Sequence, residues 1–352
     1  MIQIEGVSKD LGEFFLRDVD LEIYDNEYFV ILGPTGAGKS VLLETLAGIY
    51  RPEKGRIFID DQNITYIPPR KRNIGMVYQD YTLFPFLTVE ENIAFGLKLR
   101  KMNKIKIKRK VEELEELLHI SHLANRYPDT LSGGEQQKVA IARAIAIEPP
   151  ILLLDEPLSA LDTRTRKYLR EELKRIKKEL DITMVHVTHD QTEAMFLADR
   201  IGIMMDGEIV QVGTPREIFN EPINERVAEF VGVENILEGV IESNEDGITI
   251  VSIKGHRIEA VSNYSVGDKV RLCLRPEDIT LVLSRDKSSA RNSFKGMITQ
   301  IVPLGALIQV NVNCSFPIIA LVTKRSLEDI GLKEGDEVIV SFKATAIHIL
   351  KQ

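Results

Sequence analysis

The sequence has no tryptophan, only two cysteines and no long run of apolar residues. Cys273 and Cys314 are too few for the disulfide framework of a secreted domain, so a reducing compartment is expected, with one bridge between them left open. No apolar run reaches about 18 residues, and no basic and apolar leader precedes the first expected strand. We therefore expect that any passage across a membrane belongs to another polypeptide.

Positive charge is also in deficit. The 352 residues carry 45 basic and 53 acidic side chains, a net charge of −8, which argues against broad binding to nucleic acid. Hydrophobic residues make up 44% of the chain and charged residues 28%, enough for two or three domains with cores of their own. Composition therefore predicts an intracellular, soluble, multidomain protein.

A glycine-rich segment near the start of the chain has the spacing of a phosphate-binding loop. A buried strand is predicted before it, at 28–32, and a helix after it, at 41–47. The loop consists of Gly33, Pro34, Thr35, Gly36, Ala37, Gly38, Lys39 and Ser40. Its backbone N–H groups, with the helix N-terminus behind them, suit a nucleoside triphosphate. We expect Lys39 to reach the β- and γ-phosphates and the Ser40 hydroxyl to bind Mg²⁺.

A second motif ends an apolar run with two acids. Residues 151–154 are continuously apolar after two prolines, which is typical of a central strand buried on both faces. Two carboxylates at the end of such a strand are costly without a cation or a catalytic task. Asp155 is therefore predicted to hold Mg²⁺, directly or through one of its ligands, and Glu156 to be the general base for an attacking water. Taken alone, the two acids are more simply a strand-ending turn.

A third segment places Ser132, Gly133 and Gly134 directly before a helix predicted over 135–146. A capping hydroxyl and free N–H groups at a helix N-terminus form a second anion site. Because the phosphate loop already completes one such site, this one is expected to close over the γ-phosphate held by another copy, in a head-to-tail dimer. Taken alone, the segment is as readily a helix cap and loop.

These motifs, in this order, resemble the nucleotide-binding subunits of ABC transporters over about the first 230 residues. Gln79, the segment 159–162 and His189 occupy the places of three further family motifs. The resemblance implies an α/β P-loop ATPase domain, residues 1–232, with a mixed sheet and a helical subdomain at about 80–150, which uses ATP and Mg²⁺.

The resemblance also implies roles for single residues. Gln79 would bind Mg²⁺ and join the catalytic site to the membrane subunits, Asp162 would bridge the dimer, and His189 would contact the γ-phosphate and support Glu156 in catalysis. Taken alone, His189 is more often an ordinary histidine at a strand end. An aromatic ring often stacks on adenine in this family, but Leu11 stands at that position; Phe14 and Phe15 are alternatives that more simply belong to the core.

Partners follow from the same resemblance: a homodimer, two membrane-spanning permease subunits, an extracytoplasmic substrate-binding protein that acts through them, and a peripheral place on the cytoplasmic face of the membrane. The apolar segment 81–87 is the candidate groove for a permease helix, with packing between subdomains as the alternative. Eight cations between Lys98 and Lys110, on a predicted helix, are interpreted as a solvated face balanced by nearby glutamates, with contact to anionic lipid as the alternative.

The last part of the chain, residues 233–352, is predicted to be a duplicated, OB-like β-barrel. Segment 266–270 corresponds to 334–338 at an offset of 68, and 239–241 corresponds to 296–298 at an offset of 57. A polar loop is predicted at 284–289, between the two halves.

This part resembles the accessory domain of importer ATPases, and its second half is similar to the molybdate-binding Mop family. A tetrahedral dianion needs converging N–H and hydroxyl donors with one or two cations. The predicted oxyanion ligands are Ser289, Arg291, Asn292, Thr323, Lys324, Ser326, Lys343, Ala344 and Thr345. The first half lacks an equivalent Ser-Ala-Arg-Asn segment, and no ligand is placed there.

The two resemblances together imply the ATPase subunit of an oxyanion importer, for molybdate or tungstate, with feedback inhibition by oxyanion bound at the C-terminal part. Three alternatives stay open from the sequence. The cargo is sulfate, a polyamine or a sugar; the chain is a soluble ABC ATPase without a membrane partner; or the C-terminal part only clamps the dimer.

Overall fold

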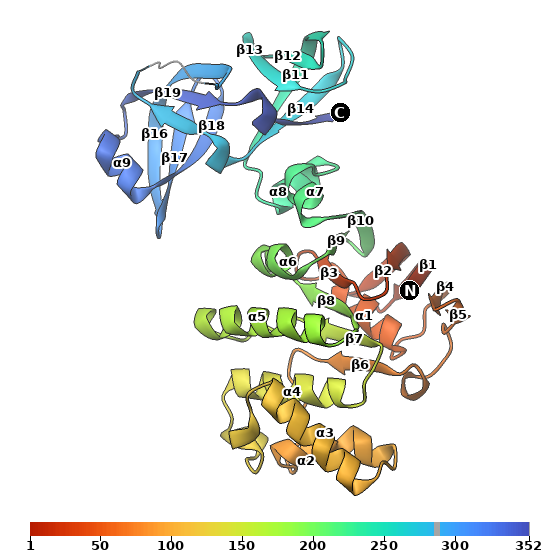
Figure 1. Ribbon diagram of the computed structural model, residues 1–352. Coiled ribbons are helices and arrows are strands. Elements are labelled where there is room, and N and C mark those ends of the chain that lie inside the picture. The colour runs from red at the N-terminus through yellow and green to blue at the C-terminus, as the bar shows by residue number, and fades with distance from the viewer. Residues whose placement is uncertain (285–288, 352) are drawn as a thin grey trace. The chain divides into compact units, whose positions relative to one another are not determined.

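The computed structural model describes residues 1–284 and 289–351 (Figure 1). The chain divides into two compact units, Met1–Ile218 and Phe219–Gln352. The boundary predicted after residue 232 follows α8 (Glu225–Phe230), within the second unit. Residues 285–288 of the predicted linking loop lie outside the described part of the chain. Among the described residues, no helix combines the length and the apolar character that a bilayer span requires.

A six-stranded mixed sheet forms the centre of the first unit. Its strands are β3 (Tyr28–Leu32), β6 (Ile74–Val77), β7 (Ile151–Asp155), β8 (Thr183–Thr188), β9 (Arg200–Met205) and β10 (Glu208–Gly213). The spatial order is β10-β9-β3-β8-β7-β6, with only β10 antiparallel to its neighbour. The strands predicted at 28–32 and 151–154 are confirmed as β3 and β7. Both are buried along their whole length, as parallel strands are when both faces of the sheet are covered.

A smaller antiparallel sheet lies on the same core. Its strands are β1 (Ile2–Asp10), β2 (Phe15–Ile23), β4 (Lys54–Ile59) and β5 (Gln62–Asn63), in the order β2-β1-β4-β5. One hydrophobic cluster joins both sheets to α1 (Lys39–Ala47), with Ile4, Leu42 and Val185 among its members. This packing fixes the N-terminus of α1, where the predicted phosphate loop ends.

Three helices form a layer beside β6 (Figure 1). They are α2 (Val89–Leu99), α3 (Lys104–Leu117) and α4 (Gly133–Ala146); the other helices of this part of the chain are α5 (Thr163–Glu179), α6 (Gln191–Leu197) and α7 (Pro215–Asn220). The prediction of a single helix under the cationic run 98–110 is wrong. Asn103 ends the turn at 100–103 and caps α3 by accepting the Ile105 N–H at 2.8 Å, so the run crosses a corner between two helices.

The second unit contains two halves with the same order of strands, and the second half has an additional helix. The first half contains β11 (Asn235–Glu245), β12 (Ile248–Ile253), β13 (His256–Val261), β14 (Lys269–Leu274), the 3₁₀ turn η4 (Pro276–Asp278) and β15 (Thr280–Val282). The second contains β16 (Asn292–Leu304), β17 (Leu307–Asn313), β18 (Pro317–Thr323), α9 (Lys324–Ile330), β19 (Glu337–Phe342), the 3₁₀ turn η5 (Ala344–Ala346) and β20 (His348–Lys351).

Equivalent turns confirm the predicted duplication. Gly267 and Gly335, 68 residues apart, both have a φ of +90°, a conformation that glycine adopts without steric cost. The Gly267 N–H donates to the Ile241 carbonyl and the Gly335 N–H to the Ile298 carbonyl, each at 2.9 Å. The same turn therefore precedes β14 and β19.

The final strands of the two halves are exchanged. The sheet order is β13-β12-β11-β14-β20 in one barrel and β15-β19-β16-β17-β18 in the other. β20 therefore completes the sheet of the first half by pairing with β14, and β15 completes the sheet of the second half by pairing with β19. Neither half has all the strands of its own barrel, and the sequence pattern did not predict this exchange.

Two buried asparagines 57 residues apart tie the halves together. The Asn235 side chain accepts the Ile319 N–H at 2.6 Å and donates to the Ile319 carbonyl at 2.9 Å. The Asn292 side chain accepts the Glu259 N–H and donates to the Glu259 carbonyl, both at 2.8 Å. Ile319 and Glu259 lie on β18 and β13, which are edge strands, so each amide pairs backbone groups that an edge leaves unpaired.

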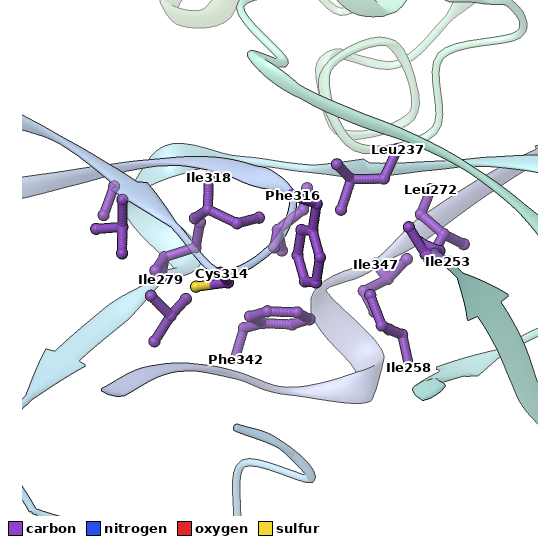
Figure 2. Packing of buried hydrophobic residues seen from close by; sticks show 14 of the residues in the cluster. Leu237, Ile253, Ile258, Leu272, Ile279, Cys314, Phe316, Ile318, Phe342 and Ile347 are labelled. Carbon is purple, nitrogen blue, oxygen red and sulfur yellow. The ribbon is translucent and has the colours of Figure 1, made fainter. Parts of the chain in front are cut away.

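One hydrophobic cluster runs through both halves. Figure 2 shows Phe316 and Phe342 near its centre, with Leu237 and Ile258 of the first half on one side and Ile318 on the other. Cys273 and Cys314 are both free, so the bridge left open by the sequence is absent; burial raises the pKa of these thiols to about 12 and about 11.

Candidate active site

The predicted phosphate loop connects β3 to α1. Gly36 and Gly38 have φ values of +84° and +95°, which turn the backbone sharply before the helix. Gly33 lies against the neighbouring strand, and a Cβ atom there would meet the Met204 carbonyl oxygen at 2.1 Å. The first turn of α1 has no acidic residue, so its N–H groups and helix dipole keep a positive potential at the loop. The geometry fits an anionic group at this helix end.

Lys39 is nearly buried beneath this loop, with 5% of its side chain exposed. Its ammonium donates to the carbonyl oxygens of Gly33 and Pro34, both at 2.9 Å, and lies 3.8 Å from a carboxylate oxygen of Glu156. Burial lowers the pKa of Lys39, and the carboxylates of Glu156 and Asp155 oppose that decrease. The ammonium therefore lies within reach of both the loop and the end of β7.

Ser40 and Asp155 meet where the loop and β7 come together. The Ser40 hydroxyl donates to Asp155 Oδ1 at 2.8 Å. Burial raises the pKa of Asp155, against the opposing effect of this hydrogen bond. No cluster of three or more His, Cys, Asp or Glu side chains suited to a metal ion exists among residues 1–284 and 289–351. Mg²⁺ does not need one, because it keeps several waters and takes few protein oxygens beside substrate phosphates, so a hydroxyl with a carboxylate fits it.

Glu156 sits directly after β7 in a strained backbone conformation, with a φ of +42°. Its N–H donates to the Val187 carbonyl of β8 at 3.0 Å, which holds this conformation. One carboxylate oxygen lies 3.0 Å from Nδ1 of His189. The structure thus brings Glu156, His189, Lys39 and Asp155 together.

A buried polar network supports His189 from behind. The Thr188 hydroxyl donates to Glu193 at 2.7 Å, and the same carboxylate oxygen lies 3.4 Å from Nε2 of His186. Nδ1 of His186 lies 3.0 Å from the Tyr28 hydroxyl, and burial raises the Tyr28 pKa well above its usual value. Because these side chains come from β3, β8 and α6, they fix the end of β8 from which His189 projects.

Arg166 also holds the candidate active site together, although it was not predicted from the sequence. Its guanidinium donates to the Leu161 carbonyl at 2.9 Å and the Ser159 carbonyl at 3.4 Å, and it pairs with Asp190 at 3.4 Å. It therefore joins the segment 159–162 to the loop that carries His189. The available signal was its spacing, because Arg166 lies four residues after Asp162, one turn along α5.

Asp162 itself caps α5. Its carboxylate accepts the N–H groups of Arg164 and Thr165 at 3.0 and 3.1 Å. The interaction with Thr165 lowers the pKa of Asp162. The predicted bridging role in a dimer concerns a side chain that is exposed and already holds the start of this helix.

Gln79 lies exposed in the turn after β6, and the following residues are fixed to α4. Arg143 of α4 donates to the Thr82 carbonyl at 2.9 Å and to the Tyr81 carbonyl at 3.2 Å. Tyr81 and Thr82 have φ values of +58° and +45°, so these contacts maintain an unusual backbone path. The loop at Gln79 and the helix that begins at Ser132 are thereby mechanically linked.

The apolar segment 81–87 has two sides. The amide of Asn92, which is fully buried, bonds to the N–H and carbonyl of Phe84 and to the Leu87 carbonyl, and the Phe84 ring lies 4.4 Å from Phe95. Phe86, in contrast, is 89% exposed. Local packing therefore accounts for Phe84 but not for Phe86.

Ser132 forms a capping box with Glu135 at the start of α4, as a capping hydroxyl was expected to do. The Ser132 N–H and hydroxyl both donate to the same Glu135 carboxylate oxygen, at 2.8 and 2.7 Å, and these bonds lower the Glu135 pKa. The hydroxyl is thus already engaged within its own helix turn. Gly134 has no room for a side chain, since a Cβ there would meet a Thr165 methyl at 2.6 Å.

A hollow of about 430 Å³ opens at this helix start. It is lined by Ser132, Gly134, Glu135, Lys138, Arg164, Thr165, Tyr168 and Leu169. None of these residues belongs to the phosphate loop or to the Asp155-Glu156 pair. The chain therefore carries two separate candidate anion sites, one at the N-terminus of α1 and one at the N-terminus of α4.

The residues considered for adenine stacking lie around a short hairpin loop. Leu11 and Phe14 are 38% and 45% exposed, so the core placement preferred for Phe14 is wrong. Phe15 is half-buried, with the Arg17 guanidinium 4.1 Å from its ring. The tight turn, in which the Leu11 N–H donates to the Phe14 carbonyl at 2.9 Å, holds Phe14 outward.

The predicted oxyanion ligands do not all line one cavity. Ser289, Arg291 and Lys343 line a hollow of about 840 Å³ in the second unit, together with Glu259, Glu277 and Asp278. Burial raises the pKa of Asp278, with the Glu277 carboxylate adding to the effect. Three acids beside two cations make this hollow a poor site for a dianion within one chain.

The other predicted ligands are placed elsewhere or already bonded. The Asn292 amide already forms hydrogen bonds with the N–H and the carbonyl of Glu259. Thr323 caps α9 by accepting the Ser326 N–H at 3.1 Å, and Lys324 lies one residue further along the helix. Ala344 and Thr345 belong to η5 next to Lys343 but do not line the hollow.

Comparison with known proteins finds a family match in each unit. Residues 16–159 match the family model for ABC transporter, and residues 288–349 match the model for the TOBE domain. The chain is 48% identical over 350 residues to a molybdate/tungstate import ATP-binding protein of Pyrococcus horikoshii, covering 99% of both chains. It is 41% identical over 355 residues to a spermidine/putrescine import ATP-binding protein of Acetivibrio thermocellus, covering 100% of this chain and 97% of the relative.

A solved structure gives a similar fold for the first unit. It is a dimeric ATP-binding cassette in a post-hydrolysis state with bound ADP and Pi. Its sequence is 34% identical, the match covers 61% of this chain and 99% of that chain, and the TM-score is 0.55.

Proposed function

Because this chain belongs to the ABC transporter family, we propose that it is the ATP-hydrolysing subunit of an importer and works as a homodimer with two permease subunits. The observation that carries this proposal is the presence of two separate half-sites. One holds a phosphate loop, Asp155 and Glu156, and the other presents the N-terminus of α4. Each is incomplete alone, so a second copy has to supply the missing half.

Hydrolysis is assigned to the first half-site. The backbone N–H groups of residues 35–40 and the Lys39 ammonium bind the β- and γ-phosphates, with Lys39 exchanging its carbonyl contacts for phosphate oxygens. Ser40, Asp155 and Gln79 would hold Mg²⁺, which would supply positive charge to offset that of the phosphates. Glu156 accepts the proton of the attacking water, and His189, 3.0 Å away, orients Glu156 and faces the γ-phosphate.

The second half-site acts on the nucleotide of the other copy. The N–H groups of Gly133 and Gly134 point out of the start of α4, and Ser132 changes its hydroxyl contact from Glu135 to the γ-phosphate. Asp162, at the start of α5, contacts the partner. Closure therefore requires ATP in both sites and is released by hydrolysis.

Coupling to the permease is assigned to the loop after Gln79. Arg143 fixes this loop to α4, so a displacement of the α4 N-terminus is transmitted to the exposed Phe86. A short helix of a permease subunit docking on Phe86 would sense the closed state. An extracytoplasmic substrate-binding protein would act through the same permease.

The proposed cargo is molybdate or tungstate. The support is the higher identity, across nearly the whole chain, to a relative with that printed name than to a polyamine relative of equal coverage. Sulfate, a polyamine or a sugar is the alternative cargo. A soluble ABC ATPase without a permease is the alternative of another class, and co-purification with hydrophobic subunits separates it from an importer.

Feedback by the cargo is the regulatory part of this proposal. Arg291 and Lys343 line a hollow that also holds three acids, whereas Lys324 and Ser326 lie on α9 outside it. A site that uses both groups would therefore be shared between two copies of the second unit. Oxyanion bound there would hold the ATPase units apart.

The decisive catalytic test compares Glu156→Gln with the wild type at matched ATP binding. Loss of the general base should lower kcat by about 10²–10⁴-fold while nucleotide binding persists. A monomeric preparation that hydrolyses ATP at the full rate, or a Ser132→Ala and Glu156→Gln double variant that keeps its activity, would contradict the two-site proposal.

The cargo test is separate. Calorimetry of the full chain with molybdate, tungstate and sulfate measures which oxyanion binds, and molybdate added to the complete transporter should depress ATP hydrolysis. Removal of the chain after Val233 should abolish that inhibition. Unchanged ATP hydrolysis at saturating oxyanion would eliminate feedback but leave the ATPase assignment intact.

A further inference from the structure

The corner between α2 and α3 concentrates positive charge on an acidic protein. Residues 98–110 contain eight lysines and arginines and no acidic residue, in a chain with a net charge of −8. Twelve of these thirteen residues are exposed or half-buried; Ile107 alone packs inward. We call this surface the cationic corner.

Most of this charge is not neutralised by neighbouring side chains. Lys110 pairs with Glu148 at 2.7 Å, Lys108 with Glu112 at 3.7 Å, and Arg100 donates to the Ile147 carbonyl at 2.8 Å. In the described part of the chain, five members have no side-chain partner: Lys98, Lys101, Lys104, Lys106 and Arg109. The interpretation of residues 98–110 as a solvated face neutralised by glutamates therefore explains only some of these cations.

Large apolar side chains are interleaved with these cations. Leu99, Met102 and Ile105 are 69%, 38% and 79% exposed. They are not the packing stripe of α3, which consists of Ile107, Val111 and Leu114 and is buried. Exposed apolar side chains at three-residue intervals among lysines are what a segment lying at a membrane interface presents.

A hollow beside the corner adds a shaped site. It measures about 380 Å³, with a floor of Leu97, Ala146 and Ile147 and a rim that includes Lys106 and Arg109. Glu113 and Glu148 also line it, and both face Lys110. Two cations without partners over an apolar floor suit a phosphate headgroup whose acyl chain lies against Met102.

We propose that the cationic corner docks on an anionic phospholipid surface. Charge complementarity orients the protein, because the remainder of this acidic chain is repelled by the same membrane. Nucleic acid is disfavoured because residues 98–110 contain no aromatic side chain for base stacking. The inference does not depend on which cargo is carried or on ATP hydrolysis.

Vesicle co-sedimentation of the full chain tests this inference. Phosphatidylcholine vesicles with added phosphatidylglycerol should bind the protein, pure phosphatidylcholine vesicles should not, and high salt should weaken the binding. Lys101→Glu, Lys104→Glu and Lys106→Glu together should reduce the partition coefficient by at least about 100-fold, at about fivefold for each charge. Leu99→Ser with Ile105→Ser should reduce it by about 10-fold.

The matched control reverses three exposed lysines elsewhere: Lys178→Glu, Lys254→Glu and Lys333→Glu. It has the same net charge as the test variant and should change the partition coefficient by less than about twofold. ATP hydrolysis without lipid should be unchanged in all variants, which reports on folding independently. Equal losses in test and control variants, or no binding to anionic vesicles, would overturn the proposal. Binding that appears only when permease subunits are in the vesicles would also overturn it and would assign the corner to a protein partner.

Discussion

Substitution of Asn292 by alanine should destabilise the second unit strongly. The side chain satisfies both backbone groups of Glu259 on the edge strand β13, with two hydrogen bonds of 2.8 Å. Alanine leaves an N–H and a carbonyl without partners beside a residue that is only 2% exposed. At about 1–3 kcal/mol for each unsatisfied group, less some relief from entering water, we expect a loss of about 2–4 kcal/mol.

The assay is urea unfolding followed by circular dichroism, since the chain lacks tryptophan for fluorescence. Hydrogen exchange in peptides from β13 assigns the loss to the second unit. Asn311→Ala is the matched control, because among the described residues the Asn311 amide hydrogen-bonds to the side chains of Gln300 and Gln309, and it should cost less than about 0.5 kcal/mol. Asn235→Ala should act like Asn292→Ala. Equal stabilities for Asn292→Ala and Asn311→Ala would refute the reasoning.

Three further predictions concern the first unit. Arg166→Met should lower kcat about 10-fold with little change in KM for ATP, because the link between the segment 159–162 and the His189 loop is lost. The control variant Arg170→Met, one turn along α5, should leave kcat unchanged. Equal effects of the two substitutions on kcat would contradict a positioning role for Arg166. Gly33→Ala should reduce the affinity for ATP at least about 10-fold in calorimetry while the protein stays folded, because the added Cβ would lie 2.1 Å from the Met204 carbonyl oxygen. An unchanged affinity would contradict this prediction and show that the loop adapts. Burial raises the pKa of Glu115 to about 7 from 4.5, so its favourable contribution is present below pH 4.5 and is lost as the pH rises through 7. Glu115→Gln should therefore stabilise the protein by about 1–3 kcal/mol at pH 8 and not at pH 4, and equal shifts of thermal unfolding at both pH values would exclude this explanation.

Local motifs were predictable because their chemistry and geometry are encoded over a few residues. The spacing of Gly33, Gly38 and Lys39 requires a turn followed by a helix start, and the apolar run 151–154 requires burial on both faces. The meeting of Glu156 and His189 came from the family resemblance instead. Their 33-residue separation gives no local signal for the 3.0 Å contact.

The helix break at Asn103 and the exposure of Phe14 were missed for a common reason. A helix cap or a tight turn depends on whether one side chain bonds to the backbone, and hydrophobicity does not report this. Asn103 was a visible capping residue, but the surrounding lysines continued a helix-forming composition. Arg166 was missed because its partners, Ser159, Leu161 and Asp190, are brought together only by the tertiary fold.

The strand exchange was unpredictable for a different physical reason. β15 and β20 are equivalent in the two repeats, so either strand satisfies the pairing pattern of either barrel. The internal repeat therefore indicated two barrels without specifying which half supplies the last strand of each. Asn235 and Asn292 form hydrogen bonds between the repeats, but the sequence analysis assigned Asn292 to the oxyanion ligands instead.

The strand exchange also determines when each barrel can be completed during translation. The ribosome completes β14 at residue 274 and does not make its sheet neighbour β20 until residues 348–351. The first barrel therefore keeps the edge of β14 unpaired while the second barrel is translated. The central sheet of the ATPase unit, in contrast, has all its strands once residue 213 has been made. During that interval the β20 strand of another nascent chain on the same polysome can pair with the unpaired β14. We therefore expect crowded translation to favour strand-swapped dimers of newly made chains.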